Sequence, residues 1–192
     1  MNYLELINKC LVELNYKQVG AFSELMKNDH KKLKNILNVL SAEICSSDKW
    51  DFLLREEVIT LPAQTTKIPA PNGRIEKIYA DGAQIELKTF GGEIILPEDA
   101  SEIRVIYYTK NCAVDVDGEE KSQLEDAEDE TLIPMPFAEP LLVYGACMRL
   151  KGNPQHVRFN YWFNMYKDAL ANLRSRSNVD VNSAPSVKLF RK

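Results

Sequence analysis

The sequence predicts an α+β protein: a four-helix bundle that carries an inserted antiparallel β-sandwich or barrel-like sheet and ends in an extended C-terminal arm. Two observations predict this class. Apolar residues recur at intervals of three and four near both ends of the chain, as they do on one face of a helix. The middle consists of short runs rich in Ile, Val, Thr and Tyr between turn residues. The expected domains are a helical bundle of residues 1–50 and 134–176, a β domain of 51–133 with an acidic loop, and an arm of 177–192.

The first two helices are expected near residues 3–15 and 23–48. Leu4, Ile7, Leu11 and Leu14 share one face of the first helix. The second helix has its own apolar stripe, with Ser23 or Asn28 as its N-cap. Two amphipathic helices joined by a short connection predict an antiparallel pair.

Two more helices are expected after the β region, near residues 138–151 and 155–175. Prolines near the start of the third helix fit its first turn, and Gly152-Asn-Pro154 ends it. Aromatic residues recur at helical spacing along the fourth helix, which favours a packed face over a base-stacking platform. These aromatic residues are Phe159, Trp162, Phe163 and Tyr166.

Six strands are expected between Lys49 and Tyr108. Asp81-Gly82 between two apolar runs is the best hairpin signal in the chain. The expected strands lie near 57–61, 66–69, 74–80, 83–88, 93–96 and 102–108. Between residues 115 and 130 there are nine acidic residues and one cation, Lys121, and such a block predicts a solvated loop.

The composition is that of an ordinary globular protein, with 45% hydrophobic and 27% charged residues among 192. The net charge of -4 argues against a generally basic nucleic-acid coat. Residues 139–192 hold nine Lys or Arg against three acids, a net charge of +6, which leaves -10 on residues 1–138. Charge sorted in this way favours oriented contact with copies of the same chain or with a larger partner.

Four cysteines without metal-ligand spacing predict buried free thiols in a reducing compartment. Glu5 and Lys9 interrupt the apolar character of the N-terminus, so no signal peptide is expected. The uncharged stretch from Pro140 to Met148 is shorter than the roughly 20 residues of a membrane span. A cytosolic protein, or one assembled from the cytosol without contact with a membrane, is therefore expected.

No catalytic, cofactor-binding or metal-binding residues are predicted. The dinucleotide, nucleotide, zinc-protease and serine-hydrolase fingerprints are absent from the sequence. His30 and His156 have polar neighbours and are expected at the surface or as caps. In the segment from Asp115 to Glu119, the glycine comes too early for a calcium loop. We therefore expect neither an enzyme nor a bound cofactor.

The order of elements and several residues resemble the head-to-tail adaptor family of short-tailed bacteriophages, also called tail tubular protein A or gatekeeper adaptors. The closest feature is Trp50-Asp-Phe52 at the end of the second helix, followed by two acids and Ile-Thr-Leu61-Pro62. The turn Leu96-Pro-Glu-Asp99 and the segment Pro134-Met-Pro136 before the third helix also resemble this family. The resemblance covers nearly the whole chain, and its motifs are packing motifs.

The resemblance implies a virion protein at the tail or neck: a twelve-fold homo-oligomeric ring beneath the portal protein. Double-stranded DNA would pass through this ring without specific binding. A tail nozzle or tail tube protein would bind the opposite side. The acidic segment could line the DNA channel or lie outside it. Trp50 and Phe52 would anchor the sheet onto the helices. The portal-docking arm would consist of Ser183, Val187, Lys188, Leu189, Phe190, Arg191 and Lys192.

Two alternatives remain open at this point. A neck or head-completion connector of a long-tailed phage would also form a ring but would sit above a different tail. A small wall-degrading hydrolase would need carboxylates for general acid and base chemistry, and the available candidates are Glu56, Glu57 and Asp99.

Overall fold

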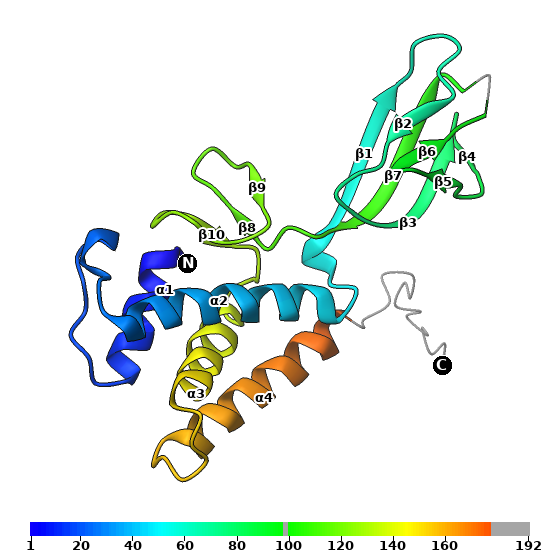
Figure 1. Cartoon of the computed structure of the whole chain (residues 1–192). Helices are drawn as coiled ribbons and strands as arrows, with labels where there is room; N and C mark the ends of the chain where they lie inside the picture. Colours follow the sequence, from blue (N-terminus) through cyan, green and yellow to red (C-terminus); the bar gives the residue numbers. More distant parts are fainter. Residues whose placement is uncertain (98–99, 178–192) are drawn as a thin grey trace, which may run out of the picture.

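The computed structural model describes residues 1–97 and 100–177 and has a mixed α+β fold with antiparallel sheets. Within these residues there are four α-helices and no closed barrel. Figure 1 shows the helices gathered in one half, strands β1 to β7 standing apart from them, and β8 to β10 lying against the helical half. The helices are α1 (Tyr3–Glu13), α2 (Asn28–Ser47), α3 (Gly145–Lys151) and α4 (Phe159–Ser177).

Local hydrogen bonds explain where α1 begins. The Asn2 side chain accepts a hydrogen bond from the backbone N–H of Glu5, and the Glu5 carboxylate accepts one from the N–H of Asn2. This reciprocal capping box satisfies two N–H groups that a helix start leaves without partners. The N-terminal helix is therefore specified by residues close together in the sequence.

The start predicted for α2 is wrong, because the helix begins at Asn28 without a side-chain cap. Before it, a short 3-10 turn, η1 (Phe22–Glu24), places Phe22 edge-on against Tyr3, 5.1 Å between ring centroids. Leu25 is also buried. Burial of these two apolar side chains turns the chain away from a continuous helix over residues 23–48.

A π-helical segment, η3 (Glu139–Tyr144), precedes α3 directly. Gly145, where α3 begins, lies close to Leu40 of α2 and Tyr166 of α4, and a Cβ built there would come within 3.1 Å of both side chains. The glycine therefore allows the close approach of three helical elements. A second 3-10 turn, η2 (Asp51–Leu53), connects α2 to the first strand.

In the described residues, ten strands form three sheets, and every pair in them is antiparallel. The first sheet has the order β1-β7-β3-β4, the second β2-β6-β5 and the third β10-β8-β9. The strands of the first sheet are β1 (Leu54–Thr60), β3 (Gly73–Ala80), β4 (Ala83–Gln84) and β7 (Glu102–Thr109). The strands of the second sheet are β2 (Lys67–Pro69), β5 (Thr89–Phe90) and β6 (Glu93–Ile95). The strands of the third sheet are β8 (Ala113–Val114), β9 (Glu120–Lys121) and β10 (Glu130–Thr131).

The predicted Asp81-Gly82 hairpin is confirmed: Ala80 pairs with Ala83, and both turn residues have positive φ angles. The strand expected over 83–88 is shorter than predicted, because the pairing ends at Gln84. A separate strand, β5, follows and joins the second sheet.

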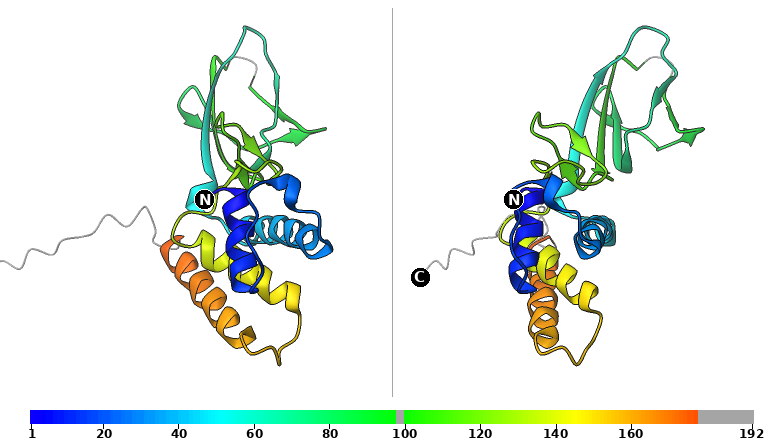
Figure 2. Two further views of the ribbon diagram at one scale, coloured as in Figure 1. Left: turned by 90° about the vertical axis from the view of Figure 1, so that its left-hand side faces the viewer. Right: turned by 60° about the vertical axis from the view of Figure 1, so that its left-hand side comes forward.

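The buried apolar residues form two separate clusters. The larger one lies among the helices and includes Cys112, Ala113, Leu124 and Ile133 from the chain around the third sheet. The smaller cluster lies between the first two sheets and consists of Ile68, Ile78, Ala80, Ile94, Leu96, Ile103 and Val105. The third sheet thus belongs to the helical half, while β1 to β7 have a small core of their own (Figures 1 and 2).

Candidate functional site

Part of the acidic segment is folded against the helices, so the expectation of a solvated loop over 115–130 holds for the exposed residues 116–119 but is wrong for Leu124 and Asp129. Residues 113–131, which we call the acidic module, contain β8, β9 and β10 and the turns between them. Leu124 is 2% exposed and belongs to the helical core, and Asp129 is only 1% exposed. Charge alone did not indicate this, since the contacts that bury these residues come from distant parts of the chain.

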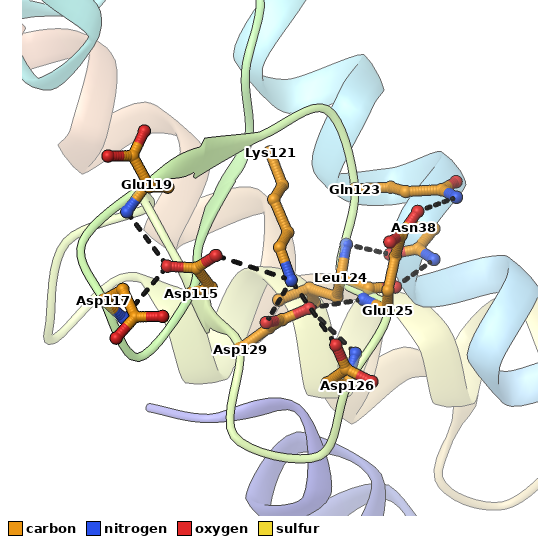
Figure 3. Close-up of polar contacts among 10 residues, drawn as sticks. All are labelled: Asn38, Asp115, Asp117, Glu119, Lys121, Gln123, Leu124, Glu125, Asp126 and Asp129. Carbon is orange, nitrogen blue, oxygen red and sulfur yellow. Dashed lines mark hydrogen bonds and ion pairs between the residues drawn. The ribbon is translucent and has the colours of Figure 1, made fainter.

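Lys121, the one cation of the module, lies among three of its carboxylates. Its Nζ is 3.1 Å from Asp129, 3.4 Å from Asp126 and 3.8 Å from Asp115 (Figure 3). The hydrogen bond to Asp129 and the neighbouring negative charges raise the pKa of Lys121 above its usual range. In the sequence, the single lysine within the acidic run is the feature that indicates this group of ion pairs.

Asp129 holds the turn before β10 together. Its Oδ2 accepts hydrogen bonds from the backbone N–H groups of Glu125, at 2.7 Å, and Asp126, at 2.8 Å. Burial opposes ionisation of this carboxyl, but these two N–H groups and the Lys121 ammonium hold its pKa below its usual range. The buried carboxylate is therefore a structural group of the module.

Hydrogen bonds to the backbone of the acidic module join it to the helices at two places. The Asn38 side chain of α2 accepts a hydrogen bond from the N–H of Leu124 and donates one to its carbonyl (Figure 3). At the start of α1, the N–H of Tyr3 donates to the carbonyl of Asp129 at 2.8 Å, and that of Leu4 to the carbonyl of Ala127 at 3.1 Å. The module is thus fixed to α1 and α2 by residues that are far away in sequence.

The loop between β8 and β9 presents an exposed apolar residue between two carboxylates. Val116 is 74% exposed, and Asp117 and Glu119, which follow it along the loop, are exposed as well. Asp115 Oδ1 accepts from the N–H groups of Asp117, at 3.0 Å, and Glu119, at 2.9 Å, and Gly118 has a φ of 87°. We call residues 115–119 the hairpin tip. Its backbone is held by its own hydrogen bonds.

Glu120 connects the module to the β1–β7 region. Its carboxylate accepts hydrogen bonds from the Arg55 guanidinium of β1, from the Thr109 hydroxyl of β7 and from the Asn111 amide. Burial opposes ionisation, but these three donors together hold the pKa of Glu120 below its usual range. A second ion pair joins Lys49 to Glu76 across the same junction, 2.6 Å between Nζ and Oε2.

A groove of about 970 Å³ opens at this junction between α2, the β3 and β7 strands and the acidic module. We call it the junction groove. It is lined by Val39, Ala42, Glu43, Cys45, Ser46, Ser47, Asp48, Lys49, Arg74, Tyr108, Thr109, Lys110, Cys112 and Ser122. No sequence pattern indicated it, since its walls come from three separate parts of the chain.

Trp50 and Phe52, the predicted anchors, lie at the end of α2. Trp50 is fully buried in the helical cluster, and its indole N–H donates to the carbonyl of Ile44. Phe52 stacks on it with ring centroids 6.0 Å apart. The structure brings the two rings together on the helical core, while the cluster between the first two sheets contains neither.

The predicted docking arm, Ser183 to Lys192, lies outside the described residues, and so does Asp99 of the hydrolase hypothesis. Glu56 and Glu57 are exposed neighbours on β1, where consecutive side chains point to opposite faces. Glu56 pairs with Arg104 on β7 at 3.4 Å. The two carboxylates therefore do not converge on one point.

The histidines differ from each other. His30 is 4% exposed in the first turn of α2, so the surface position expected for it is wrong. His156 is half-buried, and its Nδ1 accepts the N–H of Arg158 at 3.2 Å in the turn before α4 begins at Phe159. All four cysteines are free and buried, as expected.

The aromatic stripe of α4 packs only in part. Trp162 is fully buried, whereas Phe163 is 44% exposed. The cause is that α4 contacts η3 and α3 on one side, which leaves the rest of its surface open. In residues 1–97 and 100–177 no three His, Cys, Asp or Glu side chains are placed to hold a metal ion. No helix in the same residues has the length and apolar character of a membrane span.

The comparisons with known proteins identify no family for this chain. No family model matches the chain, and no curated protein sequence matches it. The arrangement of charges and surfaces therefore carries the functional argument.

Proposed function

We propose that the chain is a structural virion protein, a head-to-tail adaptor that forms a ring between the portal and the tail and continues the DNA channel. The observation that carries the proposal is the division of charge, +6 on residues 139–192 against -10 on the rest of the chain. The acidic module concentrates part of the negative charge on a folded, hydrogen-bonded surface. Opposite net charges on two parts of one chain orient its association with other subunits and partners.

Other features support a structural role over a catalytic one. The described carboxyls whose pKa is lowered take part in structural contacts: Asp129 and Asp81 accept backbone N–H groups, and Glu120 and Glu43 pair with arginines. In this proposal the helices pack as the four-helix bundle of the adaptor family and the first two sheets as its sandwich. Exposed carboxylates facing a channel would repel phosphate, so DNA would slide without sticking.

The arm, residues 183–192, would bind the portal protein, and the opposite side of the ring would bind the tail nozzle or tail tube protein. In this proposal the ring assembles on the head. The subunit number would be the twelve that the family resemblance implies.

Electron microscopy of the purified protein mixed with its portal tests this function, and a ring stacked on the portal is the expected result. Deletion of residues 183–192 should leave a folded chain that no longer co-sediments with portal rings. A matched control removes three cations elsewhere, in Lys27→Ser, Lys31→Ser and Lys32→Ser, and should co-sediment as the wild type does. If the truncated chain binds portal at wild-type yield, the assignment of the arm is wrong, and if no ring forms on the portal, so is the adaptor function.

A further inference from the structure

The junction groove carries unbalanced positive charge. Of its two acids, Glu43 forms an ion pair with Arg149, which holds the pKa of that carboxyl low. Asp48 accepts the backbone N–H of Lys49 at 2.9 Å. Asp48, Arg74 and Lys110 form no ion pair among residues 1–97 and 100–177, and both cations are exposed. The unpaired charges of the groove lining are thus two cations and one carboxylate, a net charge of +1.

Between these cations the groove wall is apolar. Val39 of α2 is 42% exposed, and Ala42 and the Tyr108 ring lie along the same groove. Such a surface favours an apolar side chain that is flanked by carboxylates.

The hairpin tip has the complementary chemistry. Val116 stands exposed, Asp117 and Glu119 follow it along the tip, and neither carboxylate forms an ion pair within the described part of the chain. The hydrogen bonds to Asp115 hold the tip in shape before any contact is made. A preorganised tip loses little conformational freedom on binding.

The hairpin tip does not occupy the junction groove of its own chain. Cys112 and Ser122, which line the groove, stand just before and just after the two strands of the hairpin, so the groove borders the base of the hairpin. In Figure 1 and in the right view of Figure 2 the β8–β9 loop lies to one side of the β1–β7 region. Among the described residues, the hairpin tip of the same chain is therefore not the occupant of the groove.

From these observations we propose that the junction groove binds the hairpin tip of a second copy of this chain, with Val116 against Val39 and Tyr108 and with Asp117 and Glu119 facing Arg74 and Lys110. The two surfaces differ, so the contact is heterologous, and repetition around an axis closes a ring. The proposal rests on the adaptor ring proposed above and names the surfaces that join its subunits.

Charge reversal tests the contact in the full-length chain. Variant T carries Asp117→Lys and Glu119→Lys in the tip, and variant G carries Arg74→Glu and Lys110→Glu in the groove. Each alone should lose self-association by at least about tenfold in a sedimentation-velocity concentration series, because like charges meet at every contact. An equimolar mixture of T and G should associate again, since each tip then meets a groove of opposite charge. The control Glu57→Lys with Glu86→Lys changes the charge equally elsewhere and should associate as the wild type does.

A photoreactive residue in place of Val116 gives a second readout. In a mixture of isotopically labelled and unlabelled chains, crosslinks from position 116 should join two copies and map to peptides containing Val39 or Tyr108. Rings that form equally well in T and G, or crosslinks that map elsewhere, overturn the docking and leave the adaptor function standing. A wild-type chain that stays monomeric both alone and with portal overturns both proposals.

Discussion

The helical half and the β1–β7 region differ in how they are held together. The helical half contains the larger buried cluster, to which the acidic module adds Ala113 and Leu124, and Asn38 of α2 forms hydrogen bonds with the backbone of Leu124. The β1–β7 region depends on seven buried residues between two small sheets. Ion pairs and the η2 turn join the two halves. The comparison indicates that the third sheet, although made of strands, is part of the helical unit and that the β1–β7 region can lose structure separately.

The largest effect is expected for Trp50→Ala. Trp50 precedes the first strand in sequence but lies in the helical cluster, so its loss should destabilise that half by about 3–5 kcal/mol. Hydrogen exchange should show the main loss of protection in α2 and α4. Trp50→Phe keeps most of the volume and should be milder. If protection is lost chiefly in β3 and β7, Trp50 belongs energetically to the sheets, and the division drawn above fails.

Ile94→Ala tests the β1–β7 region in the way that Trp50→Ala tests the helical half. Ile94 is fully buried between the first two sheets, and its truncation should cost about 2–4 kcal/mol within that region. Amides of β3 and β7 should then exchange faster, while those of α2 keep their protection. Ile95→Ala, at a neighbour that is 38% exposed, is the control and should change little. Equal acceleration of exchange in both halves would mean that they unfold as one unit.

The sequence predicted the local parts of this division better than the distant ones. The helices and the Asp81-Gly82 hairpin depend on periodicity and turn chemistry within a few residues, and both were found near the expected positions. The acidic module was misjudged because Asn38 and Tyr3, which hold it, are far away in the sequence. The junction groove could not be predicted from the sequence for the same reason, since Arg74 and Lys110 line a common surface only when α2, β3 and β7 come together.

Asp129→Asn tests whether the acidic module is a structural part of the helical half. The variant weakens two hydrogen bonds from backbone N–H groups and turns an amide toward Lys121, so a loss of about 1–3 kcal/mol is expected in chemical denaturation. Asp126→Asn, at an exposed carboxylate beside the same lysine, should change stability by less than about 0.5 kcal/mol. Equal effects of the two substitutions would contradict a special role for the buried group.

The pH dependence of stability provides a further check on Asp129 and Glu120. The folded state favours both ionised carboxylates, so their contribution is complete above the pKa of the unfolded groups, near 4. It is lost as the pH falls through the lower pKa values of the folded state. The stability of the wild type should therefore decrease below about pH 5, and the stability of Asp129→Asn should decrease less steeply. A denaturation series between pH 3 and 7 measures this slope, and parallel curves would show that Asp129 does not contribute to it.

The smallest expected effect concerns the thiols, two of which line the junction groove while the other two lie inside the helical core. The hydrogen bond from Cys45 lowers the pKa of Cys112, whereas burial raises the pKa of Cys10. Cys112 should therefore react first with iodoacetamide, because the thiolate is the nucleophile and its groove is open to the reagent. Mass spectrometry of the alkylated peptides measures the order in which the thiols react, with Cys112→Ser as the control.

Docking of a second copy in the groove should slow the reaction of Cys112 as the protein concentration rises, and in variant T this protection should disappear. Equal rates at Cys112 and Cys10 would mean that local opening of the helical core, and not the groove, controls access to both thiols.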